Sequence, residues 1–293
     1  FPDVMKTALY QDKVYGLPWI SQPVVLYYNP KLFDAAGIAY PDDTWTWETF
    51  LKNAKALTKA PDQYGFSANG WPPVHMFIWQ AGGEVISPDL KSSPIDSPEA
   101  IAGEDFYKSL IFNASCCPTE DTMAEQGFSE MFKAGKVAMF MGGASDTFES
   151  VDGVALDIRA AVPPKGPKSR TTFAWTGSTV VNAKVKNPEL AAKALVALTD
   201  GIHRWKIVSP LKELATTDVI TASFPEKWRA QKGQQVDAII AATKDMRSFN
   251  IIPRHQEWDD LFWREFQDLV YHDKGTVADL AKAARPKLEA LLP

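Results

Sequence analysis

The chain has little of what marks the common enzyme and membrane classes. It contains only two cysteines in 293 residues, which excludes a framework of several disulfides and a zinc site with four cysteine ligands. No apolar run approaches the roughly 20 residues that a membrane-spanning helix needs. The net charge of -5 comes without a basic cluster, so nothing indicates binding to nucleic acid or insertion into a membrane. We expect a soluble protein with a neutral or cationic ligand.

Motifs of nucleotide, zinc and nucleophile sites are absent as well. The sequence has no G-x-G-x-x-G, G-x-x-x-x-G-K-[ST], H-E-x-x-H, G-x-S-x-G or C-x-x-C, so it implies no cofactor and no metal, and an enzyme becomes less expected. The four histidines lack the spacing of metal ligands, and hydrogen-bonding or surface positions are expected for them: His75, His203, His255 and His272.

The two cysteines are neighbours, Cys116 and Cys117. Two ordinary thiols at a junction between a helix and a loop are the preferred interpretation. A strained vicinal disulfide is the alternative, and the sequence does not decide between them.

Strand and helix patterns alternate along most of the chain. This order predicts an α/β fold with mainly parallel sheets and two lobes. The expected strands cover 13–19, 24–29, 64–67, 137–141, 160–162 and 179–181, and the expected helices cover 30–36, 47–57, 74–81, 97–110, 128–134, 187–199 and most of 224–293. A loop rich in Pro, Gly and Lys at 163–170 is the best candidate for a linker.

Aromatic residues are abundant, with ten tryptophans. Large rings fill cores, but they also form flat platforms for ligands with apolar faces. The helical spacing of Trp47 and Phe50 places both in the core. Trp45, at the entrance of that helix, is expected to be partly exposed.

Five segments resemble, in the same order, the extracellular solute-binding proteins of carbohydrate ABC importers, the family that includes maltose-binding protein. They are KVYGLPW at 13–19, VLYYNPKLFDAAG at 25–37, TWTWETF at 44–50, FKAGKVAMFMGG at 132–143 and FAWTGSTVVNAKVKNPELAAKAL at 173–195. The resemblance implies a two-lobed periplasmic-binding-protein fold of type II. It also implies a binder, not an enzyme, that works in the periplasm or outside the cell and delivers its sugar to the membrane subunits of an ABC transporter.

The same comparison implies a division into lobes. Residues 1–22 and 164–217 would belong to the smaller, N-terminal lobe, and residues 23–163 and 218–293 to the larger, C-terminal lobe. Family members carry about a hundred residues before the segment that matches 13–19. The N-terminal lobe is therefore expected to be incomplete, and three explanations stay open: a processed chain, a segment left out, or a half-receptor completed by another chain. A lipid anchor would lie in that segment.

A set of candidate sugar-binding residues follows from the resemblance. Tryptophans at the ends of elements would stack on the sugar, and polar groups would bind its hydroxyls: Trp19, Trp71, Trp79, Ser145, Asp146, Trp175, Gly177, Ser178, Arg254 and Trp258. Many relatives have Gly-Pro-Trp where this chain has Gly143-Ala144-Ser145. Neither Ala144 nor Ser145 can stack on a sugar, so this part of the site is expected to differ.

Two other functions remain open at this level. Asp146 and Glu149 follow the Gly142-Gly143 turn, and a glycoside hydrolase needs two carboxylates that face each other across a sugar. A solvated helix N-terminus explains the same two residues equally well. The other alternative is a structural module whose unpaired sheet edge binds another chain.

Overall fold

The computed structural model describes residues 2–11, 13–68, 74–112, 115–150, 152–205 and 208–293. The chain forms two compact units. Unit 1 contains Phe1–Pro30, Met141–Pro163 and Thr172–Phe249, and unit 2 contains Lys31–Phe140, Pro164–Thr171 and Asn250–Pro293. The lobes expected from the resemblance group 1–22 with 172–217, and 31–140 with 250–293, as the units do, but they assign 23–30, 141–171 and 218–249 differently. The lobe assignment stays a prediction.

Unit 1 is built on one long strand, β3 (Leu17–Tyr28). It pairs antiparallel with β7 (Thr172–Thr179) and with β6 (Arg159–Ala161), and β7 pairs in parallel with β8 (Met246–Arg247). In unit 2, β4 (Tyr64–Ser67) pairs in parallel with β5 (Val137–Gly143), a strand whose end enters unit 1. The expectation of mainly parallel pairing is wrong: parallel and antiparallel ladders occur together.

The two strands expected at 13–19 and 24–29 are also divided differently. Lys13–Val14 form β2, which pairs with β1 (Leu9–Tyr10), and β3 then runs without a break through Pro18 and Pro23. Proline has no N–H to donate, but its φ suits extended backbone and its carbonyl still accepts. The Pro23 carbonyl accepts from the Ala144 N–H at 3.0 Å. Proline therefore does not end the strand here.

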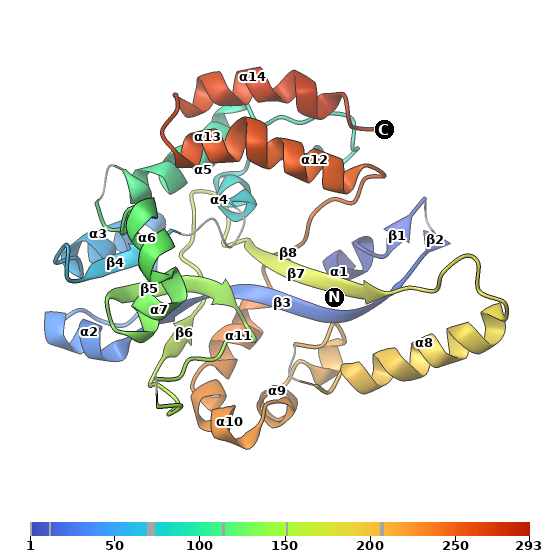
Figure 1. Cartoon of the computed structure of the whole chain (residues 1–293), viewed down its shortest axis with the longest axis horizontal. Coiled ribbons are helices and arrows are strands. Elements are labelled where there is room, and N and C mark those ends of the chain that lie inside the picture. Colours follow the sequence, from blue (N-terminus) through green and yellow to red (C-terminus); the bar gives the residue numbers. More distant parts are fainter. Residues whose placement is uncertain (1, 12, 69–73, 113–114, 151, 206–207) are drawn as a thin grey trace. The chain divides into compact units, whose positions relative to one another are not determined.

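The helices of unit 1 follow β7 in the chain. They are α8 (Pro188–Ile202), α9 (Thr217–Ser223), α10 (Glu226–Gly233) and α11 (Val236–Ala242), with α1 (Pro2–Lys6) near the N-terminus and a 3₁₀ turn at Lys212–Leu214. The expected helix start at Asn187 is confirmed, because its side chain accepts from the Leu190 N–H. Helix α8 packs along β3 (Figure 1), and Thr199 on α8 is hydrogen-bonded to Thr179 at 2.6 Å.

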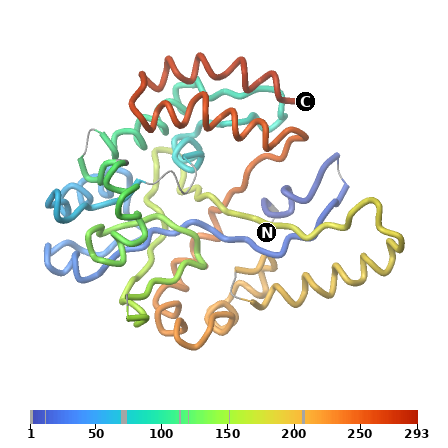
Figure 2. The backbone as a smooth tube through the Cα atoms, in the orientation of Figure 1, coloured from blue at the N-terminus to red at the C-terminus, as the bar shows by residue number. Residues whose placement is uncertain are grey.

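Unit 2 is mainly helical. Its first helices are α2 (Pro30–Ala36), α3 (Trp47–Ala56), α4 (His75–Ala81), α5 (Pro98–Ile111), α6 (Glu120–Gln126) and α7 (Phe128–Lys133). The last part of the chain forms α12 (His255–Phe262), a π-helical turn at Trp263–Gln267, α13 (Asp268–Tyr271) and α14 (Val277–Glu289), and Figure 2 shows α12 and α14 side by side. The helices expected at 30–36, 74–81 and 97–110 are confirmed.

Phe50 lies in the interior of unit 2 as expected, whereas Trp47 is half-buried. The Trp47 ring stacks on Phe106 with centroids 4.0 Å apart, and its Nε1 donates to Gln80 at 2.6 Å. The expectation that Trp45 is partly exposed is wrong, since only 5% of its surface is accessible. The ring packs against Phe33, and backbone hydrogen bonds tie residues 45 and 47 to Lys165.

A carboxyl group is buried among these helices. Glu104 on α5 has no accessible surface, and the side chain of Gln267 is close enough to influence its pKa. Burial raises the pKa of Glu104 to about 8, because the charged form loses its hydration.

We predict that Glu104→Gln removes a pH dependence of stability. The folded pKa of about 8 exceeds the ordinary value of 4.5, so the free energy of unfolding of the wild type should fall as pH rises from 4.5 to 8. The amide of the variant keeps the shape of the carboxyl group and a hydrogen-bond donor but carries no charge. At pH 9 the variant should therefore be more stable than the wild type by about 3–5 kcal/mol. Urea unfolding across pH measures this. Glu99→Gln, exposed on the same helix, should keep the wild-type pH dependence; an unchanged slope in Glu104→Gln would contradict the assignment.

Candidate functional site

Two tryptophans meet on one face of the β3–β7 ladder in unit 1. In the register, Pro18 pairs with Ser178 and Ile20 pairs with Gly177, so Trp19 is the extra residue of a bulge. A bulge turns the side chain of the extra residue away from its regular direction. The Trp19 ring stands edge-on to the Trp175 ring, with centroids 6.3 Å apart and planes at 89°. Trp175 is 43% exposed, so this pair offers an accessible aromatic surface.

Gly177 explains how Trp19 lies so close to the sheet. A Cβ at this position would be 3.1 Å from two atoms of the indole, which means that the ring rests directly on the backbone of β7. His203 holds the partner strand, β3, next to Trp19, because its Nε2 donates to the Pro18 carbonyl at 3.1 Å. The absence of a side chain at Gly177 therefore sets the position of Trp19.

Gln22 connects the tryptophan pair to the end of β5. It lies directly opposite Trp175 in the ladder, and directly opposed residues share one face. Its Nε2 donates to the Ser145 hydroxyl at 2.6 Å. A Cβ at Gly143 would come within 2.2 Å of this amide, so Gly143 leaves the space that Gln22 needs. We call Trp19, Trp175, Gln22 and Ser145 the tryptophan surface.

A buried lysine holds the turn that carries Ser145. Lys232 on α10 has no accessible surface, and its ammonium donates to the carbonyls of Ala144, at 2.9 Å, and of Asp146. The rings of Tyr27 and Phe224 lie 5.7 Å and 4.9 Å from Nζ, which adds cation–π attraction in a site shielded from water. Two charge-assisted hydrogen bonds thus fix the backbone of residues 144–146.

Asp146 faces inward and binds the start of its own turn. Its carboxylate accepts from the Gly143 N–H at 3.1 Å. Burial raises the pKa of Asp146, while the Lys232 ammonium and the Gly143 N–H lower it in part. The expected position of Ser145 and Asp146 at the end of a strand is therefore observed, but Asp146 is engaged in holding the turn.

The other predicted residues lie apart from this surface or in unit 2. Ser178 is adjacent to Gly177 on β7, so its side chain points to the opposite face. Trp79 and Trp258 are interior residues of unit 2, where Trp258 stacks on Phe262 at 5.2 Å and is 1% exposed. Arg254 is exposed and forms an ion pair with Glu257. Trp71 lies outside the described residues.

Gln22 and Lys232 were not predicted from the sequence. Gln22 and its neighbour Ser21 are the two polar residues of a mainly apolar strand, a pattern that indicates specific partners when the strand is buried. Lys232 lies on a helix rich in charged residues, EKWRAQKG, where exposure is the normal expectation. Only the folded structure shows which of these side chains points inward.

Similar proteins define the class. The model of the bacterial extracellular solute-binding protein family matches residues 1–200, and the chain belongs to this family. A binding protein of Brucella abortus (strain 2308) is 27% identical over 98% of this chain and 70% of its own length. The diacetylchitobiose binding protein of Streptomyces coelicolor is 27% identical over 71% of this chain and 52% of its own length.

The fold is shared with solved structures of the same class. An ABC substrate-binding protein of Listeria monocytogenes, in complex with cycloalternan, matches with a TM-score of 0.81 and 20% identity over 98% of this chain and 74% of that protein. The predicted α/β fold of periplasmic binding proteins is thereby confirmed. Among the described residues, no helix combines the length and apolarity needed to cross a membrane, and no group of three or more His, Cys, Asp or Glu could hold a metal ion.

We predict that Gly177→Val displaces the Trp19 ring and destabilises unit 1. The added side chain meets the indole, and overpacking of this kind costs about 1–3 kcal/mol. The same substitution in a Trp19→Ala background should cost less, because the colliding ring is gone. Urea unfolding of the four proteins in this double-mutant cycle measures the difference. Equal costs in both backgrounds would mean that the contact does not set the position of the ring.

We predict that Lys232→Met loosens the turn at 144–146. The change keeps much of the volume but leaves two buried carbonyls without their donor, at a cost of about 2–4 kcal/mol. The pKa of Asp146 should rise further, because a neighbouring cation is lost; carboxyl ¹³C NMR titration detects this. Lys227→Met is a control on the same helix, since the Lys227–Glu149 ion pair is exposed and such pairs contribute about 0–1 kcal/mol. An unchanged Asp146 pKa in Lys232→Met would refute the electrostatic link.

Proposed function

We propose that this protein binds a sugar through the tryptophan surface of unit 1 and delivers it to an ABC importer. The observation that carries the proposal is the edge-to-face pair of Trp19 and Trp175, half-exposed, next to the hydrogen-bonded pair of Gln22 and Ser145. An aromatic face and a polar pair thus lie together on one side of the β3–β7 ladder.

The chemistry of this surface suits a neutral carbohydrate. A sugar presents apolar C–H faces, which pack on flat rings, and hydroxyls, which need directional partners. Ser145 accepts a hydrogen bond from Gln22, and a hydroxyl that accepts one bond keeps its own hydrogen to donate. The four residues of this surface carry no formal charge, and the carboxylate of the neighbouring Asp146 is bound to the turn. A neutral ligand is favoured over an ion.

The relatives support an oligosaccharide as the ligand class. One of them binds diacetylchitobiose by its name, and another was solved with the cyclic sugar cycloalternan. Family membership supports a location of this protein in the periplasm or outside the cell, with the membrane subunits of an importer as its partners. We propose that the tryptophan surface binds one part of such a ligand. The other residues that the resemblance implied stay predictions: Trp71, Trp79, Gly177, Ser178, Arg254 and Trp258.

The proposed function is binding without catalysis. A hydrolase would need two carboxyl groups free to act on a glycosidic bond. Asp146 accepts from the Gly143 N–H, and Glu149 pairs with Lys227 at 3.0 Å, so each has a structural partner in unit 1. Incubation with a bound oligosaccharide tests this point: products that vanish in Asp146→Asn would establish catalysis and overturn the assignment.

We predict that Trp175→Ala weakens sugar binding. Fluorescence titration against monosaccharides, maltose, diacetylchitobiose and larger oligosaccharides should give a saturable change with at least one sugar. Loss of the exposed ring should raise its Kd roughly 5- to 30-fold, or about 1–2 kcal/mol. Trp263→Ala is the matched control, because Trp263 in unit 2 is equally exposed, 44% against 43%. Equal effects of both variants, or no response to any sugar by a cooperatively folded protein, would contradict the proposal.

A further inference from the structure

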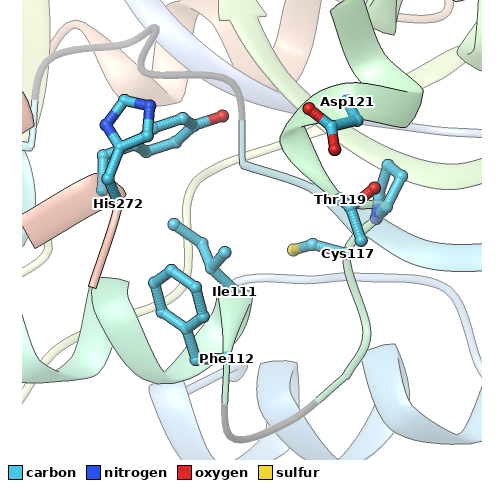
Figure 3. A pocket seen from close by; sticks show the side chains of 8 residues that line it. Ile111, Phe112, Cys117, Thr119, Asp121 and His272 are labelled. Carbon is cyan, nitrogen blue, oxygen red and sulfur yellow. The ribbon is translucent and has the colours of Figure 1, made fainter. Parts of the chain in front are cut away.

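A pocket in unit 2 lies at the two neighbouring cysteines. It has a volume of about 260 Å³, and its wall is formed by the end of α5, the segment that leads into α6, and the end of α13 (Figure 3). Ile111 and Phe112 supply apolar surface, whereas Thr119, Asp121 and His272 supply polar groups. The Cys117 sulfur points into the space between them, so a small molecule that enters the pocket meets this thiol.

The two cysteines differ in their access to this pocket. Both are free thiols in the structure and both are buried, but Cys117 lines the pocket, whereas Cys116 has no accessible surface and its Sγ donates to the Leu110 carbonyl at 3.4 Å. The neighbouring Cys117 thiol lowers the pKa of Cys116, while burial raises the pKa of Cys117. One thiol is reachable, and the other lies directly behind it.

We propose that Cys116 and Cys117 form a reversible redox switch, in which a small disulfide entering the pocket oxidises them to a vicinal disulfide. The reaction has two exchange steps. Cys117, the thiol that lines the pocket, gives up its proton and attacks the small disulfide; a mixed disulfide forms, and the leaving sulfur takes up a proton and departs as a thiol. The Cys116 thiolate then attacks the Cys117 sulfur and releases the second thiol. Two protein thiols are oxidised, and one disulfide is reduced to two thiols.

Geometry makes such a disulfide labile. Neighbouring Cα atoms are about 3.8 Å apart across a trans peptide, below the usual range of about 4.4–6.8 Å for disulfides. The ring therefore stores strain, and strained disulfides are the easily reduced, regulatory ones. The extracellular solute-binding family to which the chain belongs works in surroundings where disulfides form and persist. Closing and reopening of the ring then follow the local ratio of thiols to disulfides.

Closing the disulfide ring also changes one hydrogen bond between the cysteines and the sheet of unit 2. The peptide that joins the two cysteines includes the Cys116 carbonyl, which accepts from the Phe66 N–H on β4 at 3.0 Å. A ring of eight atoms must twist this peptide, and the carbonyl then turns away from Phe66. Oxidation thus acts at the end of β4 as well as on the pocket.

The test uses the full chain, reduced and then incubated with a small disulfide, bis(2-hydroxyethyl) disulfide. We expect both thiols to disappear, the intact mass to fall by two hydrogens, and hydrogen exchange of the Phe66 amide to accelerate, with reversal by dithiothreitol. If both thiols persist under conditions that oxidise a short dithiol peptide, the proposal is wrong. A ring that leaves Phe66 exchange unchanged would overturn the link to β4.

Single variants separate the two roles. Cys116→Ser has no second thiol to resolve the mixed disulfide, so it should accumulate the 2-mercaptoethanol adduct on Cys117. Cys117→Ser should react at least about tenfold more slowly, because the remaining thiol is inaccessible. Neither variant should show the change in Phe66 exchange. Equal modification of both variants, after circular dichroism has shown that they are folded, would refute the assigned order of attack.

Discussion

The antiparallel pairing of β3 with β7 joins parts of the chain that are far apart: Leu17 and Thr179, which meet at its end, are separated by 162 positions. Such a non-local ladder costs conformational entropy before its contacts form. The ladder fixes the bulge at Trp19, the close contact of the Trp19 ring with Gly177, and the position of Trp175 opposite Gln22. The features proposed to bind sugar are thus properties of one ladder, and a shift of register by one residue would move them to opposite faces.

The turn after β5 depends on this ladder and on a buried cation. Gln22 reaches Ser145 from β3, and Lys232 reaches the carbonyls of Ala144 and Asp146 from α10. Many relatives are expected to have a stacking Trp where this chain has Ala144 or Ser145. In the proposed function, the Ser145 hydroxyl, held by the Gln22 amide, offers the ligand a polar contact at this place.

Local sequence patterns predicted the α/β class and most helices, because caps such as Asn187 and Ser97 act over a few residues. The continuous β3 was not predicted, since proline ends strands only where an N–H is needed, and that depends on the partner. The burial of Trp45 depends on Phe33 and Lys165, which approach from elsewhere in unit 2. Among the site residues, Trp19, Trp175 and Ser145 came from the resemblance, whereas Gln22 and Lys232 become visible only when strand and helix faces are known.

Glu104 gives the core of unit 2 one property that its packing alone does not. A carboxyl group that keeps its proton up to a pKa of about 8 makes folding a proton-uptake reaction at neutral pH, and unfolding releases that proton to the buffer. The heat absorbed on melting therefore includes the ionisation heat of whichever buffer accepts it. Calorimetric enthalpies measured in phosphate and in Tris will differ for this chain, even when the protein itself unfolds identically in both.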